Sequence, residues 1–75
     1  FNPSTTIGFV QPHDGDVELE IFDELGRRVD LLSRTAAKRG QQTFQWNATS
    51  YATGVYFYRL EADGRVRTGR ATLVR

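Results

Sequence analysis

The residues with the most reactive side chains lie close together near the start of the chain. His13 is the single histidine, and Asp14 and Asp16 follow it closely. An imidazole and two carboxylates could bind a divalent cation, but side chains on neighbouring loop residues lack a converging fourth ligand. Asp and Gly also form ordinary turns, so a solvated turn is the favoured interpretation. The sequence therefore predicts no metal site and no other cofactor.

Catalysis by a nucleophile or by paired carboxylates has an equally weak basis. The chain has no Cys, so a Ser–His–Asp arrangement would require one of its serines to meet His13. Glu18 and Glu20 share the polar side of an alternating strand pattern, where they would face solvent. We therefore predict that this chain contains no catalytic residues.

Arginines gather towards the end of the chain, at Arg59, Arg65, Arg67 and Arg70. Such a cluster could recognise a phosphate-rich surface such as lipopolysaccharide, although charged strand faces that discourage edge aggregation are the competing explanation. The whole chain has ten Lys and Arg against nine Asp and Glu. That balance lacks the concentrated basic footprint of a nucleic-acid binder, so we predict no nucleic-acid partner.

Length and composition predict a single domain over residues 1–75. Two cores within 75 residues would each bury too little apolar surface, and the absence of Cys leaves stability to packing. Five Phe, three Tyr and one Trp can supply a thin two-layer core. The first ten residues lack the features of a signal peptide, so we expect the chain to be a piece of a longer protein.

Hydrophobic and polar residues alternate along most of the chain, as they do in half-buried strands. The pattern predicts strands over residues 6–10, 17–22, 28–31, 43–46, 54–61 and 65–75. The fifth segment has apolar residues on both sides, so we expect a central strand covered on both faces. The last segment changes phase, and Gly69 is the expected β-bulge. For residues 31–39, a short helix is the less favoured interpretation.

Glycines and longer connections indicate how the strands join. Asp14-Gly15, Leu25-Gly26 and Asp63-Gly64 are predicted hairpin turns, and the last is the strongest two-residue signal. Connections over 33–42 and 47–53 are long enough for the chain to cross between two sheets. The predicted fold class is all-β, a small immunoglobulin-like antiparallel β-sandwich of about six to seven strands.

Several residues have clear structural roles in such a fold. Trp46 and Tyr56 each need a hydrogen-bond partner if they are buried, and we predict that these bonds pin the two sheets together. Arg27 can pair with Asp23 across the hairpin that Gly26 closes.

Motifs occur in a fixed order along the chain: Asn-Pro-Ser-Thr-Thr-Ile at 2–7, Ile-Phe-Asp-Glu-Leu-Gly-Arg-Arg-Val at 21–29, Gly40 with Phe44 and Trp46, and Gly-Val-Tyr-Phe-Tyr-Arg-Leu at 54–60. Together with the basic, aliphatic ending at 69–75, they resemble the type A C-terminal sorting domain of the type IX (Por) secretion system. The immunoglobulin-like domain of flagellar hook-capping proteins is a close relative of that family. The residues that match family positions with a structural role are Asn2, Pro3, Asp23, Gly26, Arg27, Trp46, Gly54, Tyr56 and Leu60.

The resemblance implies a non-catalytic secretion signal and cell-surface attachment module of a bacterial hydrolase or adhesin. Such a domain passes through the periplasm and is recognised by the outer-membrane secretion machinery. A sortase-like protease then cleaves it, with the cargo attached to lipopolysaccharide or released, so the expected location is secreted or cell surface. Within the hairpin 54–75, the candidate recognition residues are Arg70, Leu73, Val74 and Arg75, because edge addition and charge can read an exposed terminal strand.

Two other functions stay open at this point. The first is a structural immunoglobulin-like interaction module that packs against the preceding domain of its parent protein. Phe22, Val55 and Phe57 are candidates for an exposed apolar docking patch, and core or inter-domain packing is the competing interpretation of these three residues. The second is an accessory carbohydrate-binding module, which needs exposed coplanar aromatic side chains. Tyr51 is the only obvious candidate for that role.

Overall fold

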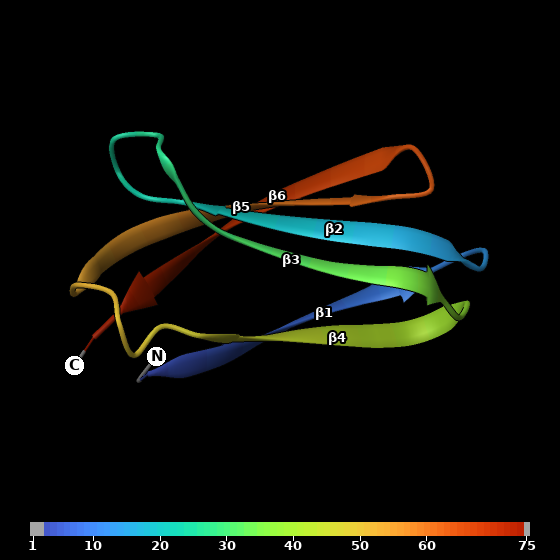
Figure 1. The fold of residues 1–75 in the computed structure, drawn as a ribbon, viewed down its shortest axis with the longest axis horizontal. Coiled ribbons are helices and arrows are strands. Elements are labelled where there is room, and N and C mark those ends of the chain that lie inside the picture. Colours follow the sequence, from blue (N-terminus) through green and yellow to red (C-terminus); the bar gives the residue numbers. More distant parts are fainter. Residues whose placement is uncertain (1–2, 75) are drawn as a thin grey trace.

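The computed structural model describes residues 3–74 and arranges them as six strands in two layers (Figure 1). The strands are β1 (Ser4–Gln11), β2 (Gly15–Phe22), β3 (Arg28–Ala37), β4 (Gly40–Asn47), β5 (Gly54–Ala62) and β6 (Arg65–Leu73). One antiparallel sheet has the order β1-β4 and the other has the order β3-β2-β5-β6. The predicted all-β sandwich is therefore confirmed. No helix that could cross a membrane occurs in the part of the chain that the structure describes.

The core lies between the two sheets and takes alternate residues from each strand. From β2, Val17, Leu19 and Ile21 point inward and are at most 2% exposed. The facing sheet contributes Phe9 and Phe44, whose rings stack with their centroids 5.8 Å apart. Complete burial of one such side chain contributes about 1.5–3 kcal/mol. Burial of the apolar faces that the alternation creates therefore holds the two sheets together.

Three connections carry the chain between the sheets, at residues 12–14, 38–39 and 48–53. The first corrects the expected Asp14-Gly15 hairpin, because β1 and β2 lie in different sheets and Gly15 already begins β2. The second corrects the expected loop over 33–42, and the alternative helix over 31–39 is absent because β3 continues to Ala37. Polar residues extend this strand because β3 is a sheet edge with one solvent-facing side. The third connection crosses between the sheets as predicted.

Two hairpins within the four-stranded sheet form as predicted. Asp63 and Gly64 link β5 to β6 with φ values of 53° and 71°. Two positive φ angles in succession are the geometry of a type I′ turn, which Asp-Gly favours. The turn between β2 and β3 has Gly26 at φ 81° and is closed by a hydrogen bond of 2.9 Å from the Asp23 amide to the Arg27 carbonyl.

β5 is the predicted central strand, since it pairs with β2 on one side and β6 on the other. The expectation that both its faces are covered is wrong. Tyr56 and Leu60 on the inner face are 7% and 3% exposed, whereas Phe57 on the outer face is 44% exposed. The second sheet covers only one side of this sheet, so the outer apolar residues remain in contact with solvent.

The predicted β-bulge at Gly69 is also wrong. The register between β5 and β6 is continuous, and Gly69 lies opposite Tyr58. The Tyr58 ring occupies the space that a Cβ on residue 69 would need. The hydrophobic alternation in residues 65–75 changes phase for another reason. The inward-facing positions of β6 nearest the Asp63-Gly64 turn are occupied by Arg65 and Arg67 instead of apolar residues. Gly69 therefore makes room for a cross-strand aromatic ring.

Gly69→Val should destabilise the domain by about 1–3 kcal/mol, although valine normally favours strands, because its side chain collides with the Tyr58 ring. Urea denaturation followed by circular dichroism measures the effect. Thr68→Val, on the outer face of the same strand, is the control and should change stability by less than about 0.5 kcal/mol. Tyr58→Ala added to Gly69→Val should recover part of the loss. If Tyr58→Ala recovers none of the lost stability, glycine is required at position 69 for its backbone conformation and not for the space that the Tyr58 ring occupies.

Candidate functional site

The hairpin between β2 and β3 is organised around the Asp23 carboxylate. Asp23 Oδ1 accepts hydrogen bonds from the backbone amides of Leu25 and Arg27 at 2.9 and 3.0 Å, and Oδ2 accepts one from Arg27 Nε at 2.9 Å. The predicted ion pair between Asp23 and Arg27 is thus confirmed. Chiefly through the bond from the Arg27 amide, this turn holds the pKa of Asp23 below its ordinary value of 3.8. Asp23 is therefore fully engaged in shaping the turn.

The same turn is attached to the start of β5 by Glu24. Glu24 Oε1 accepts a hydrogen bond of 3.0 Å from the Val55 amide. A Cβ on Gly54 would lie 3.2 Å from this oxygen, which is tighter than an ordinary van der Waals contact. The family-motif glycine therefore permits the close approach that joins the hairpin to β5.

A hydrogen bond from Trp46 joins the two sheets. Its Nε1 donates to Asp30 Oδ2 at 3.0 Å, linking β4 in one sheet to β3 in the other, as predicted. Tyr56 differs from the prediction, because its hydroxyl donates to the carbonyl of Ala52 in the connection before β5, at 2.6 Å. Sequence reasoning did not find Asp30, although a polar residue at an inward position of a strand is a signal for such a partner.

Tyr51 belongs to the same aromatic cluster. Its ring centroid lies 5.6 Å from that of Trp46, and its hydroxyl donates to the Val29 carbonyl at 2.8 Å. Burial, helped by the nearby Asp30 carboxylate, raises the pKa of Tyr51 above its ordinary value of 10.0. The side chain packs against the core edge, so it does not form the exposed aromatic surface that a carbohydrate-binding module requires.

Tyr51→Phe should reveal this hydroxyl in the pH dependence of stability. The folded state favours the neutral phenol, so the stabilisation is complete below pH 10.0 and is lost as the pH rises through the higher folded pKa. We expect the variant to be less stable by about 0.5–1.5 kcal/mol at neutral pH, and its stability to fall less steeply in alkali. Urea denaturation at a series of pH values up to about 11 tests this. Parallel pH profiles for the two proteins would contradict it.

The side chains considered as metal ligands point to different partners. His13 Nε2 lies 3.8 Å from Asp63 Oδ2, whereas Asp14 Oδ1 accepts a hydrogen bond from the Arg39 amide at 2.8 Å. Asp16 Oδ1 accepts one from a backbone amide near the end of β3, at 2.9 Å. Across residues 3–74, no group of three His, Asp or Glu side chains is arranged to hold a metal ion. The two aspartates instead brace the connection between β3 and β4.

The two glutamates on β2 lie on the outer face of the four-stranded sheet. Glu20 contacts Arg28 at 3.4 Å and Arg59 at 3.1 Å. Glu18 is exposed. Because arginines on both neighbouring strands contact Glu20, the two carboxylates do not form an acid–base pair.

The candidate recognition residues at the C-terminus differ in their exposure: Arg70 and Leu73 lie on opposite faces of β6, and Val74 follows the strand. Arg70 and Val74 are exposed, and Val74 is 54% exposed, but Leu73 is completely buried in the core. A partner cannot contact the Leu73 side chain while the domain stays folded. Arg75, like Asn2, lies outside the described residues. The structure therefore leaves Arg70 and Val74 as the surface part of the set.

Phe57 lies beside Arg70 on the outer face. It is the cross-strand neighbour of Arg70 and is 44% exposed. Within residues 3–74, Arg70 forms no ion pair with a carboxylate. We call Phe57, Arg70 and Val74 the outer patch: Phe57 and Arg70 are cross-strand neighbours, and the exposed Val74 follows the end of β6. Sequence reasoning placed Phe57 in a separate docking patch and did not join it to Arg70.

The structure is a small β-sandwich, and most of the polar side chains described above hold its fold together. On its C-terminal hairpin, the exposed Phe57 and Arg70 lie side by side. Residues 2–74 match the family described as the secretion system C-terminal sorting domain. The chain belongs to this family, which comprises sorting domains of the type IX secretion system. The family is non-catalytic, and the protein that carries the domain is exported to the cell surface or beyond. No curated protein and no solved structure matches the chain.

Proposed function

We propose that residues 1–75 act as a single sorting and attachment module at the C-terminus of a larger secreted hydrolase or adhesin. In this proposal, the outer-membrane secretion machinery recognises the outer patch. The supporting observation is the exposure of Arg70 on β6, a strand with one unpaired edge, and of Val74 directly after it. Because Arg70 forms no ion pair within residues 3–74, its guanidinium is available to an incoming acidic or phosphate group.

After export, a sortase-like protease removes the domain, and the cargo is attached to lipopolysaccharide or released. The chain contributes a folded, recognisable surface to this process, and the chemistry belongs to the machinery. Its side chains support this division, because Asp23, Glu20 and Glu24 are all engaged in hydrogen bonds or ion pairs within the domain.

A secretion assay tests the proposal directly. Residues 1–75 are fused behind a reporter that carries a signal peptide, and the fusion is expressed in a bacterium with a type IX system. Surface display or release of the reporter is the expected result, and retention in the periplasm would contradict a sorting role.

Two charge-introducing variants then locate the recognised surface. Val74→Asp, in the outer patch, should abolish or strongly reduce display. Val66→Asp is the matched control, because Val66 is 48% exposed on the outer side of β6, at the end of the strand far from Val74. Equal display from both variants would remove the outer patch from the recognition mechanism. Circular dichroism of the purified variants should show that both remain folded.

The second candidate function is an interaction module that packs against the preceding domain of its parent. The exposed apolar side chains of the four-stranded sheet favour it, since Leu31 and Phe57 are 43% and 44% exposed on that sheet. The secretion assay separates the two functions, because a purely structural module would leave the reporter in the periplasm.

A further inference from the structure

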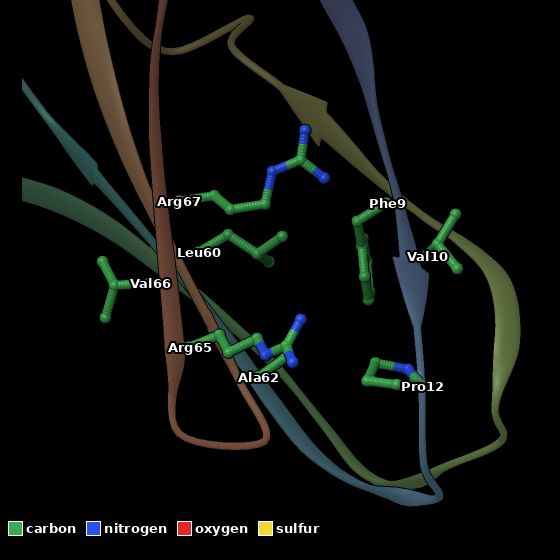
Figure 2. Close-up of a pocket in the computed structure, with 8 residues that line it drawn as sticks. All are labelled: Phe9, Val10, Pro12, Leu60, Ala62, Arg65, Val66 and Arg67. Atoms are coloured by element: carbon green, nitrogen blue, oxygen red, sulfur yellow. The ribbon is translucent and has the colours of Figure 1, made fainter.

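A second surface lies between β1 and β6, because the two-stranded sheet does not reach across the whole four-stranded sheet. The groove has a volume of about 510 Å³. Phe9 on β1 and Leu60 and Ala62 on β5 form its apolar part. Figure 2 shows Arg65 and Arg67 extending from β6 into this space, towards Phe9. The groove therefore combines an apolar floor with two guanidinium groups.

Within residues 3–74, both arginines of the groove lack a carboxylate partner. The nearest acids in sequence have other partners, since Glu61 contacts Arg59 at 3.1 Å and Asp63 lies 3.8 Å from the single histidine. In the described part of the chain, neither Arg65 nor Arg67 lies within ion-pair distance of an acidic group. Charge complementarity therefore favours a ligand with two negative groups.

The strands that border the groove each have an unpaired edge. β1 pairs with β4 alone and β6 pairs with β5 alone. Backbone N–H and C=O groups along such an edge can pair with an added strand. Val10 lies on β1 beside the groove and is 67% exposed, so an aliphatic side chain is also present at this edge.

A strand added beside β1 would lie over β6. Its alternate side chains would point at the inner face of β6, where Arg65 and Arg67 are two residues apart. Carboxylates at alternate positions would meet the two guanidiniums, and the rest of the strand would cover Phe9 and Leu60. An isolated phosphate could use the arginines, but it would leave the apolar floor and the backbone edge without partners.

We propose that this groove binds an extended segment of a partner protein, which pairs with β1 and carries two carboxylates at alternate positions. The site is separate from the outer patch, since Arg65 and Arg67 are on the opposite face of β6 from Arg70. The inference does not depend on the sorting role.

Fluorescence anisotropy with a labelled synthetic peptide tests the proposal. The probe is a short, extended peptide of valine and threonine residues with two glutamates at alternate positions. We expect saturable binding to the full chain that weakens as salt concentration rises. Replacement of both glutamates by glutamine should reduce affinity by about tenfold or more. Equal affinity for the two peptides would overturn the proposal.

Variants of the protein locate the binding site. Arg65→Glu combined with Arg67→Glu should weaken binding by about tenfold or more, because repulsion replaces two charge-assisted contacts. Arg70→Glu is the matched control on the opposite face of the same strand and should leave the affinity within about twofold. The affected residues are exposed, so circular dichroism should show an unchanged fold. A loss of binding in Arg70→Glu equal to that in the double variant would contradict a site in the groove.

Strand pairing is tested with two N-methylated versions of the probe. Successive backbone N–H groups of a strand point to opposite sides, so methylation of alternate residues blocks one edge of the peptide at a time. Pairing with β1 requires that one version loses binding while the other retains it. Retention by both versions, or full displacement of the probe by inorganic pyrophosphate at an equal concentration, would show a simple anion site and overturn strand addition.

Discussion

Trp46→Ala is expected to remove a large part of the stability of the domain. The indole is 1% exposed and its ring lies 5.3 Å from that of Tyr56, so truncation removes the largest fully buried side chain. Replacement of a buried Trp by Ala costs about 3–5 kcal/mol. A chain of 75 residues has a total stability of roughly 4–11 kcal/mol, so this loss approaches or exceeds the lower limit. Urea denaturation followed by far-ultraviolet circular dichroism is the measurement, because the near-ultraviolet signal falls with the loss of the single tryptophan whether or not the domain unfolds.

Trp46→Phe separates packing from hydrogen bonding in this prediction. Phenylalanine keeps an aromatic ring in the core but removes the donor that reaches Asp30 across the two sheets. We expect a folded variant that is less stable by about 1–3 kcal/mol, because the Asp30 carboxylate loses a partner. An alanine variant that unfolds at the same urea concentration as the wild type would disprove the central role of Trp46.

The sandwich itself could be predicted because its information is local. The alternation of Val17, Leu19 and Ile21 with glutamates specifies a strand with one buried face, whichever strand lies beside it. Asp63-Gly64 specifies its hairpin equally locally, since the two residues adopt the required positive φ angles themselves. The motifs shared with the family contain the same local signals, namely turn residues and alternating strand faces, so their structures could also be predicted from the sequence.

Strand pairing between distant segments decided the features that the sequence analysis missed. Gly69 looks like a local irregularity until Tyr58 is placed opposite it. Likewise, β3 continues through polar residues because its position at a sheet edge leaves one side in solvent. Neither fact is contained in the residues of the strand concerned, because both depend on which strand lies next to it.

The candidate site shows the same division. The sequence drew attention to the basic C-terminal hairpin, but it could not divide Arg59, Arg65, Arg67 and Arg70 between two faces. The continuous register with β5 places Arg70 outside and Arg65 and Arg67 inside, above the groove. The groove could not be predicted from the sequence, because it exists only where one sheet is narrower than the other.

The same register determines how a C-terminal deletion must be interpreted. Removal of residues 70–75 takes away two members of the outer patch, but it also takes away Leu73, which is 0% exposed in the core. Loss of surface display after this deletion therefore has two possible causes. Point variants at the adjacent residues 73 and 74 distinguish them, because one side chain is in the core and the other faces solvent.

Leu73→Ala is expected to lower the free energy of unfolding by about 2–5 kcal/mol, because it leaves a cavity where β6 packs on the core. Val74→Ala should change it by less than about 0.5 kcal/mol, since that side chain is 54% exposed. Urea denaturation measures both. If export requires only a folded domain, display should fall with Leu73→Ala and survive Val74→Asp. If the machinery contacts the outer patch, Val74→Asp should lose display while it stays folded. A Leu73→Ala variant as stable as the wild type would contradict the burial of the Leu73 side chain in the core.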